Sequence, residues 1–563
     1  MTWIAVGGRH FDLAFRLTPL TTAVAALVVI VSLMVFIYAT TYMRGDPRQG
    51  RFFRLLSLFI VAMLALVLAA DVITLFIAWE IVGLCSYLLI GFWFEKKNVP
   101  EAASLAFITT RIGDAALLAG LLLLVLHSGS ADIDVIRASA FPAAALLLFI
   151  GAATKSAQIP FQSWLPEAMV GPTPVSALLH SATMVAAGVF LVARFYPLFV
   201  AAPNVLHLIA WIGAVSALFG SAMAMVATDL KRALAYSTIS QLGLMYVGLG
   251  AGSLVAGIAL LIAQALYKST LFLAAGAVDD VVGSTELARM GGLRRSMPLT
   301  FTAFLLAAAA LAGLPVTMAL PAKDAVLSAA WNTSALLFLV VAIASLITAM
   351  YSARLVALVF FGECKSGARE DRSLAFPAIL LAALLIFGPR LFGTTPRGSL
   401  VVTVFAISIA VIGFAIGAAF QDRFRLPGWE TEFGLRTATD AVGRLGLGIV
   451  GAAARVDATV MDPIPNRAAA ALLRAIRGAA GLDRATFDRV ATFVSSAALQ
   501  GIRAARSFDI RALDEFVRKL GDGTLRAGQA VRGLQTGRIE NYLLMIYTWF
   551  ALMMVWGLSC SLR

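Results

Sequence analysis

The sequence predicts an all-α polytopic membrane protein, and three observations support that fold class. Hydrophobic residues make up 60% of the chain and charged residues only 13%, whereas about one quarter of a soluble globular domain is charged. Apolar runs of about twenty residues recur along most of the chain, and a helix of that length spans the bilayer core. These runs lack the alternation of apolar and polar residues that marks a transmembrane barrel strand.

The lengths of the apolar runs predict about fourteen transmembrane helices. Two of the segments, 141–169 and 299–333, are unusually long and contain prolines, which interrupt helices. Interrupted helices in corresponding places of two halves suggest inverted repeats, here of five helices each. The expected crossings are 21–43, 54–70, 71–93, 103–126, 141–169, 174–196, 205–227, 233–250, 253–278, 299–333, 335–361, 374–391, 400–420 and 541–558.

The charge of the loops predicts how the chain is oriented in the membrane. Basic residues concentrate in "RGDPRQGRFFR" after the first expected crossing and in "LARMGGLRRSMP" after the ninth, while "HSGSADIDVIRAS" on the opposite side carries little positive charge. The positive-inside rule therefore places the basic loops in the cytoplasm and the N-terminus outside, in a bacterial inner membrane. The net charge of +13 fits this rule and does not indicate nucleic-acid binding.

The composition divides the chain into four regions. Residues 1–20 form an N-terminal segment, and 21–420 contain the main transmembrane bundle. Between 421 and 540, apolar residues recur at three- and four-residue steps among frequent Arg and Asp, a pattern typical of an amphipathic helix. That helix either packs on its own domain, which the pattern alone slightly favours, or lies along neighbouring membrane subunits on the cytoplasmic side. Residues 541–563 contain a final transmembrane anchor.

Several ionisable residues fall inside the expected membrane spans. Such residues are costly in a bilayer and usually mark an ion or proton path. Snorkelling does not explain Glu80, Lys155, Lys268 and Lys323, because they lie too far from the segment ends. The candidate proton-relay residues are Glu80, Lys155, His180, Lys268 and Lys323, and Asp114 and Asp324 are expected to have a modulating or exit role.

Structural interpretations compete with the functional one for some of these charges. Arg111 and Asp114 are three residues apart on one helical face, and a local ion pair is as good an interpretation as a functional role. His180 alone could be a buried imidazole with satisfied hydrogen bonds. For Asp229 and its neighbours Lys231 and Arg232, a role at the membrane interface is the preferred interpretation.

The buried charges suit proton transfer. Burial disfavours the ammonium form of a lysine, and a nearby carboxylate favours it, so moving the partner switches the lysine between loading and releasing a proton. Glu80 and Lys155 are expected to form such a pair, with Lys268 as a central relay and Lys323 near an exit. His180 can shuttle protons. Prolines beside Lys155 and Lys323 disturb the helices there, as is tolerated where backbone lines a water-filled cavity.

No motif for a cofactor or metal is found. Cys85, Cys364 and Cys560 are far apart, without the paired spacing of a disulfide framework or a metal site. A Walker A loop, a dinucleotide-binding glycine motif and iron–sulfur or haem motifs are absent from the sequence. We therefore expect no cofactor in this chain, and an energy source other than an ion gradient must come from a partner.

Long runs of the sequence resemble a known family. "LAADVITLFIAWEIVGLCSYLLIGFWF", "KSAQIPFQSWLPEAMVGPTPVSALLHSATMVAAGVFLVAR", "DLKRALAYSTISQLG" and "LYKSTLFLAAGAV" resemble the L-type antiporter-like membrane subunit of NADH:quinone oxidoreductase (respiratory complex I), which is related to the Mrp antiporters. The resemblance covers residues 15–365 well and the rest more loosely. The ending "RGLQTGRIENYLLMIYTWFALMMVWGL" also resembles that subunit, which has a lateral helix and a final anchor.

The resemblance implies a role for each candidate. Glu80 matches a glutamate that pairs with a lysine, Lys155 matches that lysine, and Asp114 matches an aspartate that modulates the pair. His180, Lys268 and Lys323 match the histidine and the two lysines that continue the proton relay. The implied partners are other membrane subunits contacted by the lateral helix, and FMN, iron–sulfur clusters and quinone would lie in partner subunits.

The sequence departs from the family in two ways. The resembled subunit has two more N-terminal spanning helices than are expected here. Four residues before Lys268, where the family often has a histidine, this chain has Gln264. An amide can hydrogen-bond water but does not carry a proton at ordinary pH.

Two other functions stay open from the sequence. One is the membrane subunit of a DAB-type inorganic carbon uptake complex, which would couple a cation gradient to a large zinc-containing, carbonic-anhydrase-like soluble partner. The other is a Mrp-type cation/proton antiporter subunit or a membrane hydrogenase subunit. The lateral helix argues against the carbon-uptake function unless the helix holds the partner.

Overall fold

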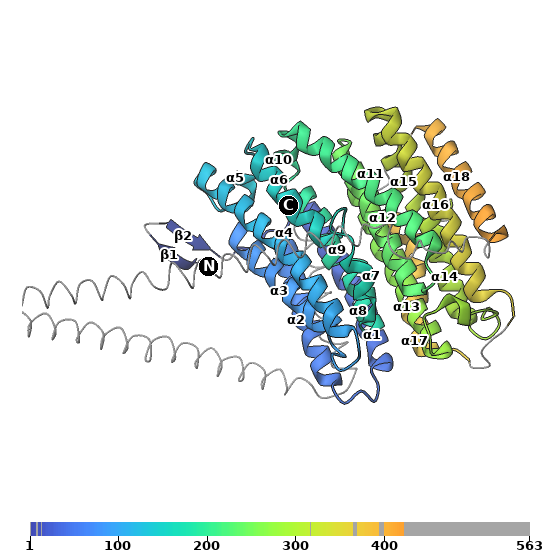
Figure 1. The fold of residues 1–563 in the computed structure, drawn as a ribbon. Coiled ribbons are helices and arrows are strands. Elements are labelled where there is room, and N and C mark those ends of the chain that lie inside the picture. The colour runs from blue at the N-terminus through green and yellow to red at the C-terminus, as the bar shows by residue number, and fades with distance from the viewer. Residues whose placement is uncertain are drawn as a thin grey trace, which may run out of the picture. The chain divides into compact units, whose positions relative to one another are not determined.

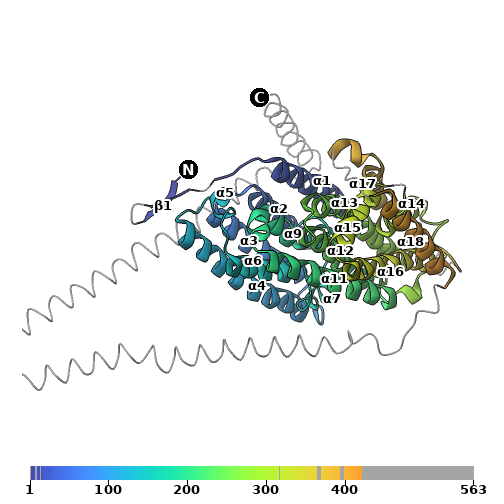
Figure 2. The same ribbon diagram turned by 90° about the horizontal axis from the view of Figure 1, so that it is seen from above.

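The computed structural model describes residues 2–6, 9–12, 14–315, 317–363, 369–392 and 399–420. The predicted amphipathic region 421–540 and the predicted crossing at 541–558 lie outside the described residues. All described helices belong to one compact unit, Met1–Thr439. They run along a common direction as a bundle (Figure 1), and Figure 2 shows the same bundle from above.

The chain begins with a short hairpin, β1 (Thr2–Val6) paired antiparallel with β2 (Arg9–Asp12). The prediction of an all-α chain omitted this hairpin, and the rest of the described fold is helical, as predicted. The four helices that follow are α1 (Pro19–Tyr42), α2 (Gln49–Leu68), α3 (Val72–Ile90) and α4 (Val99–Ser128).

Side chains next to the membrane-length helices fix where these helices begin. Thr18 and Thr21 form a reciprocal capping box at the start of α1. Asp71 accepts a hydrogen bond from the backbone N–H of Thr74 at the start of α3, at 2.8 Å. Such caps satisfy backbone donors that the first helical turn leaves without partners.

Both predicted interruptions are confirmed. The segment 141–169 consists of α6 (Pro142–Lys155), eight residues of irregular chain, α7 (Trp164–Glu167) and the 3₁₀ turn η1 (Ala168–Val170). The segment 299–333 consists of α14 (Pro298–Ala312) and α15 (Ala319–Thr333). At the end of α14, Gly313 has a φ of +86°, a conformation that glycine adopts without strain.

A third interruption was not predicted. The expected crossing 174–196 is divided into α8 (Thr173–Leu179) and α9 (Met184–Arg194), with His180 at the end of α8. The Ser181 hydroxyl donates to the carbonyl of Ala177, and the Thr183 hydroxyl donates to the carbonyl of Leu178 at 2.6 Å. These hydroxyls satisfy backbone acceptors at the break, so no proline or glycine is needed there.

Two helices form the centre of the bundle. Every residue of the hydropathic stretch in α13 (Leu254–Val282) is buried, and α12 (Leu230–Gly250) is buried over nearly its whole length. α13 packs against helices from both ends of the described chain, including α1, α8, α12 and α17 (Arg372–Phe392). Lys268, in the middle of α13, is therefore surrounded by protein and not by lipid.

The remaining helices complete the bundle. Among the described residues, nine helical segments are long and apolar enough to cross a membrane, and three further apolar helices are shorter. The protein is therefore a multi-pass membrane protein, while the total of about fourteen crossings stays a prediction. The elements not yet named are α5 (Ile133–Ile136), α10 (Tyr196–Val200), α11 (Pro203–Val226), η2 (Leu287–Arg289), α16 (Ala335–Phe360) and α18 (Leu400–Ala419).

Candidate functional site

Three of the predicted site residues gather in one charged cluster. Glu80 lies on α3, Asp114 lies on α4, and Lys155 is the last residue of α6, where the first interrupted segment leaves the helix. Lys155 is fully buried and Asp114 is 2% exposed. A charged lysine and a charged carboxylate in such a place are stable only when they are paired.

Arg111 joins the members of this cluster. The Lys155 Nζ lies 3.5 Å from Asp114 Oδ1, and Arg111 Nη2 lies 2.9 Å from Asp114 Oδ2. Arg111 also forms an ion pair with Glu80. We call the series Glu80–Arg111–Asp114–Lys155 the charged chain.

The charged chain differs from the expected direct pair of Glu80 and Lys155. In the described part of the protein, the ion pair of Glu80 is with Arg111 and that of Lys155 is with Asp114. The reason is the three-residue spacing on α4, which puts Arg111 and Asp114 on one helical face between α3 and α6. That spacing is visible in the sequence, but it does not tell which helices flank α4.

An aromatic side chain completes the surroundings of the buried pair. Trp79 Nε1 donates a hydrogen bond to Asp114 Oδ1. The Lys155 ammonium lies 5.1 Å from the centroid of the Trp79 ring, within the range of a cation–π contact. Trp79 therefore stabilises both the carboxylate and the ammonium of the pair, a role that was not predicted.

Gly83 lets the charges approach α3. A β-carbon at this position would lie 2.5 Å from Arg111 Nη2 and 3.0 Å from Lys155 Nζ. Gly83 is one turn after Glu80, so the missing side chain opens α3 where the two cations of the charged chain meet it. A side chain here would push both cations aside.

His180 lies beyond the charged chain at the break between α8 and α9. It is fully buried. Its ring centroid is 6.1 Å from that of Trp164 and 6.5 Å from that of Phe272. Neither ring nitrogen has a hydrogen-bond partner among the described residues. The interpretation of His180 as a buried imidazole with satisfied hydrogen bonds therefore does not fit this geometry, because buried polar atoms are normally paired.

Lys268 lies in the middle of α13 and points to α12. Its ammonium donates to the carbonyl of Leu234 at 3.2 Å and to the hydroxyl of Ser237. Both acceptors are neutral, so Lys268 has no carboxylate partner among the ion pairs of the described residues. One turn earlier, Gln264 is fully buried and neither of its amide atoms is hydrogen-bonded to a described residue.

Lys323 and Asp324 lie on α15, just after the second interruption. The Lys323 ammonium donates to the carbonyl of Leu311 near the end of α14. Asp324 accepts a hydrogen bond from Thr403 of α18 at 2.6 Å. A cavity of about 10 Å³ touches Lys323, Gly313 and Ser345, and about that volume holds one water molecule.

α12 connects the charged chain with Lys268. The Tyr246 hydroxyl lies 2.9 Å from that of Ser156, the residue after Lys155, and also donates to the carbonyl of Ala152 on α6. Toward the other end of α12, Gln241 accepts from Tyr267, which precedes Lys268, at 3.1 Å. One rigid helix thus bonds to the elements that carry both lysines.

The charges at the start of α12 make local structural contacts, and their place at the membrane interface stays a prediction. Asp229 caps the helix by accepting from the backbone N–H of Arg232 at 2.9 Å. Lys231 pairs with Asp279 of α13 at 2.8 Å, and Arg232 pairs with Glu167 of α7 at 3.2 Å. These pairs hold the first interrupted segment and α13 onto α12.

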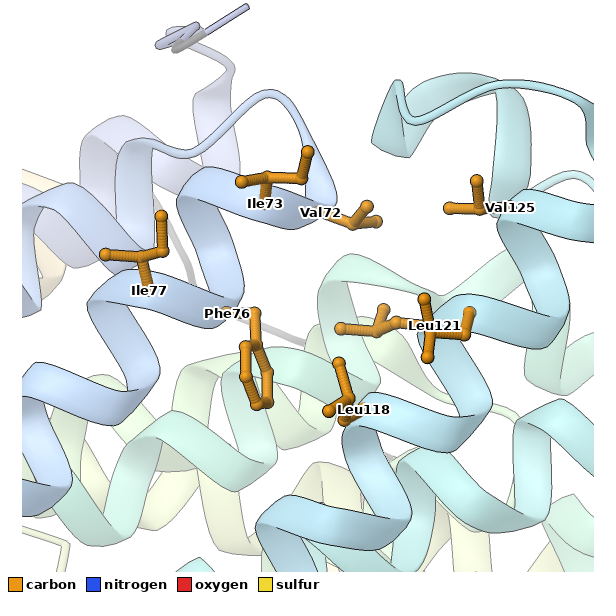
Figure 3. Close-up of a pocket in the computed structure, with 8 residues that line it drawn as sticks. Val72, Ile73, Phe76, Ile77, Leu118, Leu121 and Val125 are labelled. Carbon is orange, nitrogen blue, oxygen red and sulfur yellow. The ribbon is translucent and has the colours of Figure 1, made fainter. Parts of the chain in front are cut away.

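A larger hollow of about 120 Å³ lies elsewhere, between α3 and α4 (Figure 3). Its lining is entirely apolar, and several of the lining side chains are exposed on the surface of the bundle. A site without polar groups cannot hold an ion. The lining residues are Val72, Ile73, Phe76, Ile77, Leu118, Leu121, Leu122 and Val125.

Within the described residues, no group of three His, Cys, Asp or Glu side chains could hold a metal ion. The polar groups instead form a discontinuous series through the bundle, from the charged chain past His180 to Lys268 and Lys323. Such a series can bind and pass on protons, because each lysine and the histidine can exist with or without a proton.

Comparisons with known proteins show which family the chain resembles. Residues 69–348 match the family described as NADH:quinone oxidoreductase/Mrp antiporter, TM, and residues 3–53 match NADH-Ubiquinone oxidoreductase (complex I), chain 5 N-terminus. In structure, the chain is similar to a protein in a Mrp complex from Dietzia sp. DQ12-45-1b, with a TM-score of 0.66 and 32% identity, over 83% of this chain and 55% of that one.

Similar sequences carry consistent names. The chain is 38% identical to NAD(P)H-quinone oxidoreductase subunit 5 of the Paulinella chromatophora chromatophore, over 75% of this chain and 67% of the relative. It is 42% identical to the chloroplast subunit 5 of Physcomitrium patens, over 65% of this chain and 54% of the relative. It is 41% identical to chain 5 of Picosynechococcus sp., over 64% of this chain and 58% of the relative. The matched part thus spans little more than half of most of these relatives. The chain belongs to the family of antiporter-like membrane subunits found in NADH:quinone oxidoreductases and Mrp antiporters.

Proposed function

We propose that this chain is the L-type antiporter-like subunit of a proton-pumping NADH:quinone oxidoreductase, and that it moves protons through its buried polar series. The observation that carries the proposal is the charged chain, which places a fully buried Lys155 against Asp114 and Arg111 inside a membrane bundle. Buried charges of this kind are costly and are retained where ions or protons pass. The subunit itself does no redox chemistry in this proposal.

The charged chain can act as a switch for proton binding. A carboxylate beside Lys155 favours its ammonium form, and the Arg111 guanidinium, which also binds Asp114, competes for that carboxylate. When Arg111 moves toward Glu80, Asp114 is left to Lys155, and the lysine holds a proton. When Arg111 moves toward Asp114, Lys155 loses its partner and releases the proton toward His180 and Lys268.

The later residues continue the transfer. Lys268 is held by neutral acceptors on α12, so its ammonium form is not locked by a carboxylate. Lys323 lies on α15, which packs against α13, so a proton on Lys323 disfavours a proton on Lys268. This repulsion would drive a proton from Lys323 toward an exit, where Asp324 bonds to α18. In this proposal Glu80, His180 and Lys323 are also members of the proton relay.

The setting of the subunit belongs to the same proposal. We place the chain in a bacterial inner membrane with its N-terminus outside, because the basic loops lie on one side. The partners are further membrane subunits along which residues 421–540 lie as a lateral helix on the cytoplasmic side, anchored by 541–563. FMN, iron–sulfur clusters and quinone belong to partner subunits. The two interrupted segments fit five-helix inverted repeats within about fourteen crossings.

A cation/proton antiporter is the second candidate. The likeness to a protein in a Mrp complex, at 32% identity, favours it. The same carboxylate and lysine groups serve either function. What differs is the energy source: a redox partner in one case and a cation gradient in the other.

Purification from the native membrane distinguishes the candidates. The tagged full-length chain is solubilised in mild detergent, and the co-purifying proteins are identified by mass spectrometry. Flavin- and iron–sulfur-containing subunits would support the proposed function. Small cation-antiporter subunits without redox groups would support the second candidate, and a single large zinc protein would contradict both.

A further inference from the structure

A group of buried hydroxyls outside the charged chain lies between α1, α8 and α13. Thr173 and Ser176 are fully or almost fully buried on α8, and Tyr38 is fully buried on α1. The hydroxyls of Tyr38 and Ser176 have no hydrogen-bond partner among the described residues. Serine can often satisfy itself on its own helix, but a tyrosine hydroxyl stands too far from its backbone to do so.

These hydroxyls lie close together with that of Tyr42 on α1. The Tyr42 hydroxyl lies 3.3 Å from Thr173 Oγ1, and the Tyr38 and Tyr42 rings stack with centroids 5.7 Å apart. A β-carbon at Gly276 would lie 2.4 Å from the Tyr38 hydroxyl and 2.5 Å from Thr173 Cγ2, so both side chains flank the same point of α13. Glycine at 276 therefore permits α1, α8 and α13 to meet there.

α8 extends the row toward His180. Ser176 and His180 lie three and seven residues after Thr173, a spacing that places all three on one face of a helix. His180 follows the last residue of α8, and both of its ring nitrogens are without partners among the described residues. Next to it, Ser181 Oγ lies 2.6 Å from Ser269 Oγ, the residue after Lys268.

The other end of the row reaches the membrane face where α13 ends. Tyr42 is the last residue of α1 and is only partly buried. Asp280 on α13 is exposed and lies one helical turn after Gly276, the position that the Tyr38 hydroxyl flanks. An exposed carboxylate attracts protons to the mouth of a polar path.

We propose that Tyr42, Tyr38, Thr173 and Ser176, called the hydroxyl row, are the proton uptake route from the Asp280 face to His180. A proton that binds a lone pair of one hydroxyl is matched by release of that hydroxyl's own proton on the far side. Each oxygen thus ends neutral, with a water molecule bridging any gap, and turns back before the next transfer. This inference rests on the proposed function and adds the side from which its relay is loaded.

The test removes single hydroxyls and measures proton flux. Tyr38→Phe keeps the ring stack with Tyr42, and Ser176→Ala keeps the helix. Ser32→Ala is the matched control, because Ser32 is also a buried α1 hydroxyl without a partner among the described residues, but it lies on another face of α1. Proton movement is measured in native membrane vesicles that contain the full-length chain with its partners, driven first by NADH and then by an imposed sodium gradient.

The two drives separate this inference from the proposed function. If NADH oxidation drives proton movement in the wild type, the proposed function stands. If only the sodium gradient drives it, the cation/proton antiporter replaces the proposed function. The uptake route is then tested with the sodium gradient as the energy source. We expect Tyr38→Phe and Ser176→Ala to slow proton flux by about tenfold, with Ser32→Ala unchanged and all variants inserted at wild-type levels. Flux in both variants equal to that of Ser32→Ala would overturn the route, as would a wild type that moves protons under neither drive.

Discussion

The ammonium of Lys155 lies 3.5 Å from one oxygen of Asp114, while the other oxygen of Asp114 lies 2.9 Å from the guanidinium of Arg111. One buried carboxylate is therefore shared by two cations, and the second cation also binds Glu80. This sharing makes the pairing of Lys155 depend on the position of Arg111. The predictions below test that dependence and the surroundings of the other relay residues.

Replacing Asp114 tests the shared carboxylate. Asp114→Asn leaves Lys155 and Arg111 without their common partner, and we expect proton transport to fall by about a hundredfold, as when a positioned acid or base is lost. Removing one partner of a buried pair also costs about 3–5 kcal/mol of stability, so the amount of inserted protein is measured beside the flux. Glu101→Gln, an exposed position on the same helix, is the control. Full transport by Asp114→Asn would show that the shared carboxylate is not needed.

Gly83 offers a test that leaves every charge in place. In Gly83→Ala the new β-carbon collides with Arg111 Nη2 and Lys155 Nζ, which are the ends of flexible side chains and can shift. We therefore expect normal insertion and about a tenfold loss of transport, because small displacements of reacting groups are costly. Gly50→Ala is the matched control, since its β-carbon would meet nothing within 4 Å. If both variants transport alike, the close approach to α3 has no functional importance.

Lys268 is tested through its acceptor on α12. Ser237→Ala removes a hydroxyl that accepts from the buried ammonium and leaves the Leu234 carbonyl as the one remaining acceptor among the described residues. We expect proton transport to slow, because the loss of a hydrogen bond to a charged group costs about 1.5–3 kcal/mol. Transport rates of Ser237→Ala and Ser221→Ala are compared, since among the described residues Ser221 bonds only to its own helix, at Leu218. Equal rates would argue against Lys268 as a charged relay.

The ion pair between Arg16 of the N-terminal segment and Asp132 provides a pH test outside the membrane spans. Burial raises the pKa of Asp132, but hydrogen bonds from Arg16 and from the backbone N–H of Asp134 outweigh this effect and leave the pKa below its usual value. A carboxylate with a lowered pKa stabilises the fold above its unfolded pKa of about 3.9 and loses that contribution as the pH falls through its folded value. In detergent at pH 7, the melting temperature of the wild type should therefore be higher than that of Asp132→Asn.

The difference between the two melting temperatures should shrink as the pH falls below about 4. Glu95→Gln is the control, because Glu95 pairs with Arg48, and this ion pair does not involve the N-terminal segment. A melting difference between wild type and Asp132→Asn that stays constant down to the lowest pH would contradict the role of the charged form of Asp132.

Much of the bundle is predictable from the sequence because each membrane-length apolar run must form a helix. The prolines near Lys155 and Lys323 likewise predict the two confirmed interruptions. The break at His180 is different, since it depends on Ser181 and Thr183 hydroxyls that bond to backbone carbonyls and could equally lie on a continuous helix. Local sequence does not decide between those two outcomes.

The site shows the same division. Burial of Lys155, Lys268 and Lys323 follows from their places inside apolar runs, and the structure buries all three. The partner of Lys155 does not follow, because it depends on which helices flank α4 and on the space that Gly83 leaves at α3. Tertiary contacts of this kind are set by packing between segments far apart in the chain.

The central claim is that Lys155 carries protons driven by a redox partner. The most direct test is the number of protons taken up for each NADH oxidised by inverted native membrane vesicles, compared between the wild type and Lys155→Ala. Our account predicts that the variant complex assembles and oxidises NADH but moves fewer protons for each NADH. An unchanged ratio in Lys155→Ala would contradict the account.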